Sequence, residues 1–447
     1  MLHHAGRFPP QPGHLLQMNI LFLIPDQLRA DWSGIHPALP LRTPHLDALR
    51  ARGTTFTNAI TPSPLCAPAR ACLATGRSYG KCGVRNNGDD LPATLPTFYQ
   101  HLRQHGYHVM GCGKFDLHKA SYIWNVDGKN QLATWGFDDG IDNEGKIDAI
   151  LSGSETPKGP YMAFLEHHGW RERHIADMEM RRQDKYATAP TPLPDWAYCD
   201  NWIGDNALEL LDRAPAGKPW FLQVNFTGPH NPWDITEKMA SWYAGVRFPE
   251  PVCAGEAPTA VHQAIRANYA AMIENIDRLI GRLVAEISAR GELDETLIVF
   301  ASDHGEMLGD HDRWGKVVPF QPSLAVPLVL AGPGIPSQAR HEAPATLLDL
   351  PATLLDYAGA DPLPDADSRS LRPVLETGAA ERRFVTAALN DWQAIIADGH
   401  KLIEYSDGRR LLFDLVRDPH ESQNLASAKT ATVRHLQALL HPKPPPL

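Results

Sequence analysis

The chain lacks the features that mark membrane-spanning and exported proteins. None of its windows approaches the run of about 18 apolar residues that a membrane-spanning helix needs, so no membrane segment is expected. Residues 1–17 contain three prolines and two glycines but no apolar core, unlike a secretory signal peptide. We therefore expect residues 1–17 to be a disordered arm and the protein to be cytoplasmic, or periplasmic or secreted if a leader has been trimmed away.

Cysteine is scarce and scattered. No Cys-x-x-Cys pair and no zinc-like spacing occurs, which gives no sign of a zinc site. In a chain of 447 residues, six separated cysteines do not make a disulfide scaffold, so a reducing compartment is the default. The cysteines are Cys66, Cys72, Cys82, Cys112, Cys199 and Cys253.

An excess of positive charge is also missing. The formal net charge is −10 and the sequence pI is about 6.1, which argues against nucleic acid or an anionic membrane as the main partner. An anionic small substrate stays open, because the charge inside a cleft can oppose the net charge. The composition, 43% hydrophobic and 21% charged, is typical of a globular protein with a sizeable core.

Short apolar runs alternate with helical patterns along residues 18–370. Strands are predicted over residues 19–24, 107–112, 220–226, 296–301 and 324–330, and helices over 44–52, 95–105 and 261–290. This alternation predicts an α/β fold with a large, mostly parallel sheet between helices, in which ligands bind beyond the carboxyl ends of the strands.

Two regions depart from that pattern. Residues 120–200 have weak periodicity and are expected to be a long insertion with little regular structure, supplying substrate loops. Its tryptophans have two interpretations, stacking on a sugar face or packing the insertion, and packing is the commoner role. Residues 371–447 are expected to form a small subdomain, an antiparallel sheet with strands near 384–386, 394–396, 401–403 and 411–413 and a helix over 433–440. The tryptophans of residues 120–200 to which the two interpretations apply are Trp124, Trp135, Trp170 and Trp202.

The most specific pattern lies in residues 65–77. Cys66 precedes a proline by two residues and Arg70 by four, and Leu-x-Thr-Gly-Arg follows at residues 73–77. A single free cysteine is usually inert core packing. The whole pattern, however, resembles the signature of the type I sulfatases of the alkaline phosphatase-like superfamily. The resemblance implies the alkaline phosphatase-like fold. It also implies that a formylglycine-generating enzyme oxidises Cys66 to formylglycine, whose hydrated aldehyde is the nucleophile.

Acidic clusters follow two of the predicted strands. Asp26 and Gln27 come directly after the first strand, and Asp303 and His304 follow the strand at 296–301. The resemblance implies that these four residues and Cys66 bind one divalent cation. Family analogy favours Ca²⁺, while the imidazole makes Mn²⁺ a close alternative and leaves Mg²⁺ open. Gln27 and His304 are similar to the pair found in phosphonate monoester hydrolases and choline sulfatases.

Further segments resemble the sulfate-binding parts of the family. Lys114 matches the lysine of the family's Gly-Lys-x-His, and His230 and Lys316 match its substrate-binding histidine and second lysine. The family's acid–base histidine is missing, because position 116 is aspartate. His118 is our candidate for that role, and Asp116 is the alternative.

These residues have complementary tasks in sulfate ester hydrolysis. Lys114, Lys316 and Arg70 neutralise the charged sulfate oxygens, and His230 binds sulfate or protonates the leaving oxygen. The expected activity is hydrolysis of an aryl, alkyl or sugar sulfate. A phosphonate monoester hydrolase or phosphodiesterase is the alternative, and an inactive ligand-binding relative is a third interpretation. A homo-oligomer is left open.

Overall fold

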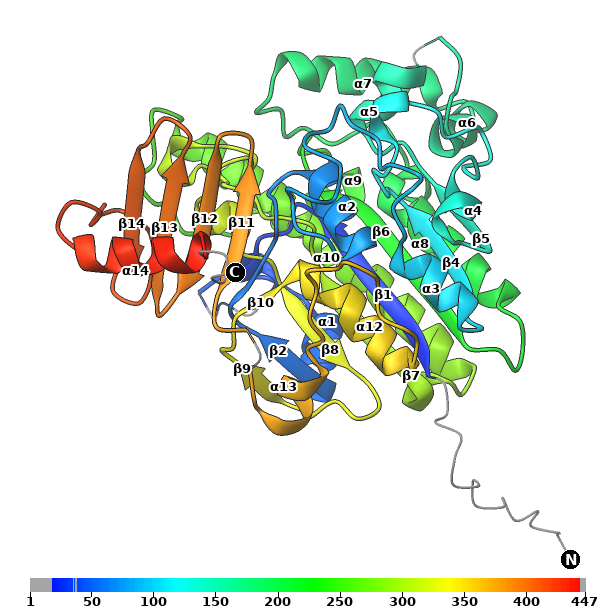
Figure 1. The fold of residues 1–447 in the computed structure, drawn as a ribbon. Helices are drawn as coiled ribbons and strands as arrows, with labels where there is room; N and C mark the ends of the chain where they lie inside the picture. The colour runs from blue at the N-terminus through cyan, green and yellow to red at the C-terminus, as the bar shows by residue number, and fades with distance from the viewer. Residues whose placement is uncertain (1–17, 35, 37, 154, 381, 443–447) are drawn as a thin grey trace, which may run out of the picture.

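The computed structural model describes residues 18–34, 36, 38–153, 155–380 and 382–442. The arm predicted over residues 1–17 lies outside the described residues. The centre of the molecule is an eight-stranded sheet with the order β5-β4-β6-β1-β7-β8-β2-β9 (Figure 1). All neighbours are parallel except β8, which is antiparallel to both β7 and β2, so the predicted mixed, mostly parallel sheet is confirmed. The strands are β1 (Asn19–Asp26), β2 (Gly53–Phe56), β4 (His108–Gly113), β5 (Asp139–Asp142), β6 (Trp220–Pro229), β7 (Thr296–Ala301), β8 (Leu328–Ala331) and β9 (Ala339–His341).

The alternation of side chains along β1 explains the layers on the two faces of the sheet. Leu21 and Leu23 belong to one hydrophobic cluster, and Ile20, Phe22 and Ile24 belong to another. Successive side chains of a strand point to opposite faces, so an uninterrupted apolar run needs a cover on each side. The first cluster includes α1 (Pro44–Arg52), α8 (Cys199–Arg213) and α10 (Thr259–Ala289), and the second includes α2 (Cys66–Thr75), α3 (Phe98–Gln104) and α12 (Leu350–Ala358).

The expectation of little regular structure in residues 120–200 is wrong. This region contains α4 (Leu132–Trp135), β5, α5 (Ile147–Gly153), α6 (Pro160–His167), α7 (Arg171–Gln183) and the start of α8. The helix α7 is mostly charged and buries only His174, Met178 and Arg181, so it shows little apolar periodicity. Trp124, Trp135 and Trp202 are only 1%, 3% and 8% exposed, which fits packing.

The strand predicted over 324–330 is right only in its second half. Leu324 ends the short helix α11 (Gln321–Leu324), and β8 begins at Leu328. Pro327 directly precedes β8, and proline has no N–H to donate to a strand ladder. Leu324 and Val326 are therefore buried without extending the strand.

A second, four-stranded antiparallel sheet forms the C-terminal subdomain, as predicted. Figure 1 shows it beside the main sheet, with α14 packed on it. Its elements are β11 (Val385–Leu389), β12 (Trp392–Ala397), β13 (His400–Tyr405), β14 (Arg410–Asp414) and α14 (Thr430–Leu440).

The remaining elements are short. A two-stranded sheet pairs β3 (Ala59–Ile60) with β10 (Ala345–Thr346), and α9 (Glu237–Ala240) and α13 (Arg372–Thr377) are single small helices. Within the described part of the chain, none of the helices is both long enough and apolar enough to cross a bilayer.

Candidate active site

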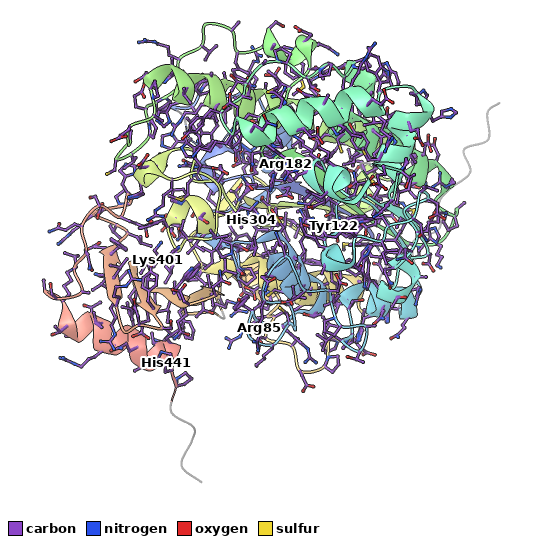
Figure 2. The ribbon with its side chains drawn as sticks, turned by 90° about the horizontal axis from the view of Figure 1, so that it is seen from above. Arg85, Tyr122, Arg182, His304, Lys401 and His441 are labelled. Atoms are coloured by element: carbon purple, nitrogen blue, oxygen red, sulfur yellow. The ribbon has the colours of Figure 1, made fainter. Side chains whose placement is uncertain are left out.

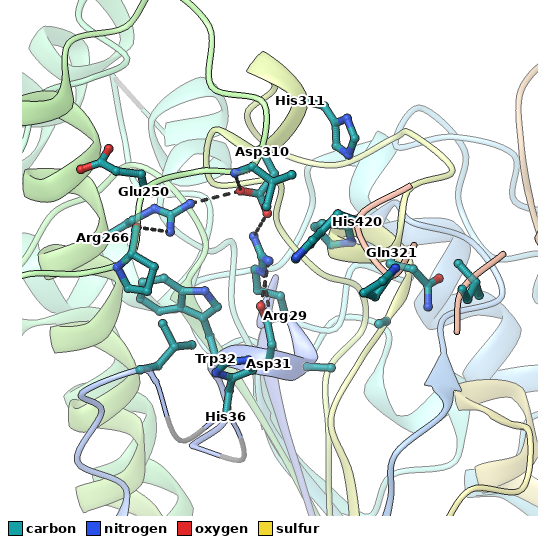
Figure 3. Close-up of a pocket in the computed structure, with 18 residues that line it drawn as sticks. Arg29, Asp31, Trp32, His36, Glu250, Arg266, Asp310, His311, Gln321 and His420 are labelled. Carbon is teal, nitrogen blue, oxygen red and sulfur yellow. Dashed lines mark hydrogen bonds and ion pairs between the residues drawn. The ribbon is translucent and has the colours of Figure 1, made fainter. Parts of the chain in front are cut away.

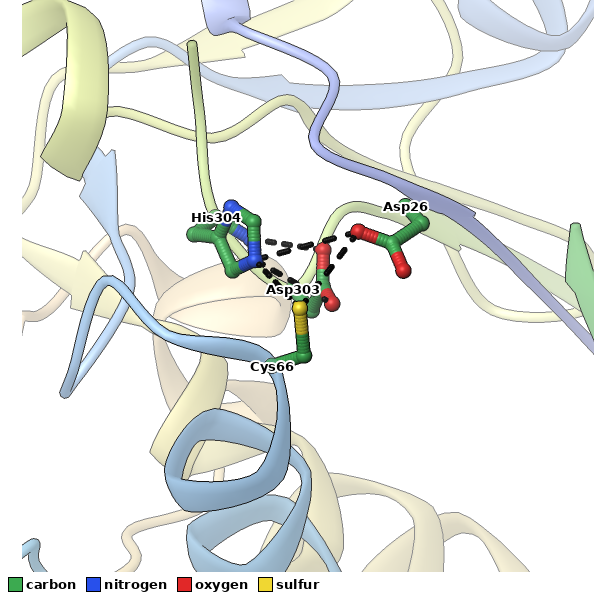
Figure 4. A group of neighbouring side chains, drawn as sticks. All are labelled: Asp26, Cys66, Asp303 and His304. Atoms are coloured by element: carbon green, nitrogen blue, oxygen red, sulfur yellow. Dashed lines mark hydrogen bonds and ion pairs between the residues drawn. The ribbon is translucent and has the colours of Figure 1, made fainter. Parts of the chain in front are cut away.

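Four buried side chains meet where two neighbouring strands of the main sheet end. Asp26 is the last residue of β1, Asp303 and His304 follow β7, and Cys66 begins α2. Figure 4 shows the four side chains pointing at one another, with ligand atoms all within 4.8 Å. Cys66 Sγ lies 3.2 Å from His304 Nε2 and 3.8 Å from Asp26 Oδ1. The predicted metal ligands therefore converge, because parallel strands place their carboxyl ends at one edge of the sheet.

The ring of His304 is oriented with one nitrogen toward this cluster. Its Nδ1 lies 3.1 Å from the carbonyl oxygen of Gly305, while Nε2 faces Cys66, Asp26 and Asp303. A bond from Nδ1–H to that carbonyl leaves the lone pair of Nε2 free, which is the usual arrangement of a metal-binding histidine. Two carboxylates, an imidazole and a sulfur, all buried, thus make a donor set that fits a divalent cation.

Gln27 is the fifth predicted ligand, and its backbone is unusual. Its φ angle is 68°, in the left-handed region, and its N–H donates to Asp303 Oδ1 at 3.0 Å. The side-chain nitrogen donates to Glu306 and to Asn231 Oδ1, while the side-chain oxygen accepts from Lys316. These contacts point the amide oxygen of Gln27 toward Lys316.

Arg70 and Lys114 supply positive charge next to the carboxylates of Asp303 and Asp26. Arg70 lies one turn along α2 from Cys66, and its Nε donates to Asp303 Oδ2 at 3.0 Å. Lys114 Nζ donates to Asp26 Oδ2 at 2.5 Å. Burial raises the pKa of Asp26, but the cations Lys114, Arg70 and Lys316 outweigh it and hold the pKa well below its usual range. Arg70 Nη2 has no hydrogen-bond partner among the described residues and lies 3.5 Å from Asp26 Oδ2.

His230 and Lys316 complete the positive side. Lys316 Nζ lies 2.6 Å from His230 Nε2, and His230 Nδ1 contacts the carbonyl oxygen of Asn231. Burial and the ammonium of Lys316 hold the pKa of His230 well below its usual value, so the imidazole is neutral. The structure thus brings the predicted sulfate-binding residues Arg70, Lys114, His230 and Lys316 together around the cluster.

The two acid–base candidates lie in different surroundings. Asp116 contacts Lys114 at 3.2 Å and Lys119 at 3.0 Å. His118 Nε2 instead lies 2.7 Å from Asp142, and its ring packs between Trp124 and Trp135. Among the described contacts, Asp116 joins the residues around Cys66 and His118 does not.

The surroundings of the Cys66 thiol favour the thiolate. Burial and the carboxylate of Asp26 raise its pKa, but Lys114, Lys316 and His304 together lower it to about 5. The thiol of Cys112, buried on β4, has its pKa raised by the same desolvation without such neighbours, so it stays protonated. Cys66 is therefore placed where chemistry on sulfur is favoured.

A cavity of about 170 Å³ opens beside the cluster. It is lined by charged and polar groups that include Lys114, Lys119, Lys146, His230 and Asn231. A larger cavity, about 480 Å³, lies between α10 and the C-terminal subdomain (Figure 3). None of the predicted site residues lines the larger cavity, and its two arginines are held by carboxylates, Arg29 by Asp31 and Asp310 and Arg266 by Asp310. The smaller cavity is the one that adjoins the chemistry.

Several residues of the site were not singled out from the sequence. Glu306 and Asn231 stand inside segments that carry predicted residues, but their contacts with Gln27 depend on the folded loops. Lys119, directly before the insertion, and Lys146, within it, also line the cavity, and each is paired with an aspartate, Lys119 with Asp148 and Lys146 with Asp234. Only their closeness in sequence to Lys114 and to the acidic run at 142–144 offered a signal.

The mixed sheet, with candidate metal ligands and a cysteine at its strand ends, has the alkaline phosphatase-like fold. The chain belongs to the sulfatase family, whose sequence model matches residues 18–360. It is 29% identical to a choline-sulfatase of Rhizobium meliloti, covering 91% of this chain and 82% of that protein, and 25% identical to an arylsulfatase of Clostridium perfringens, covering 93% and 91%. The crystal structure of phosphonate monoester hydrolase of Agrobacterium radiobacter shares the fold, with a TM-score of 0.80, 24% identity and 95% coverage of both chains.

Proposed function

We propose that this enzyme hydrolyses the sulfate ester of a small alcohol or saccharide with a formylglycine derived from Cys66. The observation that carries the proposal is the convergence on Cys66 of three further candidate metal ligands, Asp26, Asp303 and His304, and of four cationic or imidazole side chains. Formylglycine would supply a hydrated aldehyde, whose first hydroxyl attacks sulfur and whose second allows the sulfate to be expelled as the aldehyde re-forms.

Asp26, Gln27, Asp303 and His304 would hold the divalent cation together with residue 66. A divalent cation there lowers the pKa of a hydroxyl and neutralises sulfate charge. Carboxylate and amide oxygens suit Ca²⁺, which we propose as the resident ion, and the imidazole of His304 keeps Mn²⁺ as an alternative.

The chain's own cations would bind and orient the sulfate group. Arg70 has a free N–H on Nη2, and Lys114 and Lys316 bring ammonium groups to either side of the cluster. These groups are held in place by Asp26, Asp303 and Gln27 before substrate arrives, so they need little reorganisation. The Lys316–His230 pair is placed to donate a proton to the leaving alcohol oxygen.

We assign the acceptance of the second hydroxyl proton to Asp116 rather than to His118. Asp116 contacts Lys114, whereas His118 is engaged by Asp142. Burial raises the pKa of Asp116, but Lys114, Lys119 and Arg70 outweigh it and lower the pKa below its usual range. Asp116 is therefore an ionised acceptor throughout the working pH range.

The direct test is mass spectrometry of the tryptic peptide that contains Cys66, from protein co-expressed with a formylglycine-generating enzyme. We expect conversion of Cys66 to formylglycine and turnover of an aryl sulfate in proportion to the converted fraction. An intact thiol in fully active protein would overturn the mechanism. No hydrolysis by converted protein would favour a ligand-binding role.

Phosphonate monoester hydrolysis is a second candidate. Gln27 and His304 favour it because they resemble the pair of phosphonate monoester hydrolases, and the fold is shared with one such enzyme. Comparison of kcat/KM for an aryl sulfate and an aryl phosphonate monoester on the same preparation separates the two activities. We expect the sulfate to be preferred.

A further inference from the structure

The C-terminal sheet covers both chain segments that frame the active site. Its apolar face, which includes Trp392 and Phe413, packs against Leu65, directly before Cys66, and against Phe320, which follows Lys316 by four residues. The N–H of Ala388 in β11 donates to the carbonyl oxygen of Pro62 at 3.0 Å. The subdomain therefore contacts the approach to Cys66 and the loop that carries Lys316.

A buried ion pair in this subdomain is hydrogen-bonded to the loop that carries Lys316. Lys401 on β13, whose side chain is fully buried, contacts Glu421 and donates to the carbonyl oxygen of Pro319 at 2.6 Å. The other carboxylate oxygen of Glu421 accepts from the N–H of Gln321 at 2.6 Å. Figure 2 shows Lys401 within the C-terminal sheet and His304 at the centre of the molecule. A buried ion pair contributes little net stability compared with apolar packing, so its use here points to a role in fixing geometry.

Trp392 fixes the residue next to Lys316. Its indole Nε1–H donates to the carbonyl oxygen of Val317 at 3.2 Å, and the N–H of Val317 donates to Pro64 at 3.2 Å. Val317 has a φ of 75°, which is unfavourable for a β-branched residue. Such a backbone persists only where the surrounding contacts hold it, and both contacts here join the loop to other parts of the site.

The loop is also tied to the metal-ligand side. The N–H groups of Gly305 and Glu306 donate to the carbonyl oxygens of Ser323 and Pro322, each at 2.9 Å. Residues 316–323 thus connect the segment after Asp303 and His304 to the C-terminal sheet. A shift at one end of this connection moves the ammonium of Lys316 relative to Gln27 and His230.

We propose that Lys401 and Trp392 are positioning residues that act through Lys316. They hold its ammonium beside Gln27 and His230, although neither of them lines the cavity next to Cys66. The inference rests on the proposed function for the sulfate-binding role of Lys316. It makes the C-terminal sheet a part of the catalytic apparatus rather than an independent module.

The kinetic test is a double-mutant cycle. Trp392→Phe removes the N–H donor and part of the ring while keeping an aromatic side chain, and Lys401→Met removes the ammonium while keeping most of the length of the side chain. We expect each to lower kcat/KM for an aryl sulfate by about 10- to 100-fold, because small displacements of a substrate-binding group are costly. In a Lys316→Ala background neither change should have a further effect. Lys429→Met, which removes a partly exposed lysine of the same subdomain, is the control and should stay near wild type.

Two results would overturn the inference: wild-type kcat/KM in both single variants, or full additivity with Lys316→Ala. Hydrogen exchange gives a readout independent of activity, and it applies to Trp392→Phe even if Lys401→Met fails to fold. We expect faster exchange in the peptide over residues 312–325 and no change in β1. Unchanged exchange at 312–325 would contradict the proposal. Faster exchange in an enzyme that hydrolyses no sulfate ester would instead overturn the proposed function and leave the positioning contacts standing.

Discussion

The side-chain nitrogen of Gln27 donates a hydrogen bond to the carboxylate of Glu306, and both side chains are buried. This contact decides which end of the Gln27 amide faces Lys316, because a carboxylate accepts and cannot donate. The other oxygen of Glu306 accepts from the N–H groups of Leu308 and Gly315, so the carboxylate is itself fixed. Glu306 thus orients a predicted metal ligand without belonging to the ligand set.

We predict that Glu306→Gln weakens metal binding by about 10- to 100-fold, the usual effect of losing a partner of a metal ligand. An amide that accepts from Leu308 and Gly315 turns its NH₂ toward the NH₂ of Gln27, which forces Gln27 to rotate. Competition titration of chelator-treated protein with Ca²⁺ and Mn²⁺ measures the change. Glu376→Gln, at an exposed position, is the matched control, and equal affinities in both variants would contradict the role of Glu306.

Removal of Arg70 should strongly destabilise the fold. The guanidinium pairs with Asp303 and lies 3.5 Å from Asp26, and all three groups are buried. Arg70→Ala leaves buried carboxylates with less compensation, so we expect the free energy of unfolding to fall by about 3–5 kcal/mol. Urea titration measures this, with Arg52→Ala as the control, because the exposed Arg52–Asp294 pair should contribute at most about 1 kcal/mol. A loss no larger than the control's would refute the structural role of Arg70.

The two acid–base candidates can be separated by substitution. We expect Asp116→Asn to lower kcat by about 10²-fold or more, since it removes the proton acceptor beside Lys114. His118→Ala should mainly lower stability, because it leaves the buried carboxylate of Asp142 without its imidazole partner. Steady-state kinetics at equal formylglycine content, together with melting temperatures, distinguish the two effects. A larger loss of kcat in His118→Ala would reverse the assignment.

Glu144 should make stability depend on pH. Burial raises its pKa to about 7, despite backbone hydrogen bonds from Met162 and Tyr161 that lower it. The folded state therefore keeps a proton that the unfolded chain loses near pH 4.5. The contribution of Glu144 to the free energy of unfolding is greatest below about pH 4.5. It declines by roughly 3 kcal/mol in total as the pH rises from there through about 7.

The isosteric variant Glu144→Gln tests this behaviour. Relative to wild type, its free energy of unfolding should increase between pH 5 and pH 8, because an amide loses no proton. Urea titrations at both pH values measure the difference. The exposed Glu166→Gln serves as the control and should give the same difference at both pH values. A pH-independent difference for Glu144→Gln would show that this carboxyl titrates normally.

The prediction of which site residues lie together rests on residues that follow strands. Asp26, Asp303 and His304 could be placed together because β1 and β7 are continuous apolar runs, and parallel strands bring their carboxyl ends to one edge. It was incomplete where long-range loop contacts decide a side chain's surroundings. His118 and Asp116 are only two residues apart, yet one faces Asp142 and the other Lys114.

The same distinction holds for the fold. The alternation of apolar runs predicted the main sheet, and turn-separated short strands predicted the C-terminal sheet. The insertion at 120–200 was misjudged because α4, α5 and α6 are short and the longer α7 buries few apolar side chains, which leaves little periodic signal. Tertiary packing, rather than local propensity, stabilises such helices.

By itself, the sequence determined the chemistry of this protein: a cysteine in a modification signature, carboxylates and an imidazole after strands, and lysines at family positions. These are local patterns, because each depends on residue type and spacing within one segment. Only the tertiary structure decided which groups act on each other. Glu306 orients Gln27, Asp116 lies beside Lys114, and Lys401 and Trp392 hold the Lys316 loop. These contacts join residues far apart in the chain or depend on side-chain direction. Such contacts form only when the sheet and its covering layers pack, which no single segment encodes.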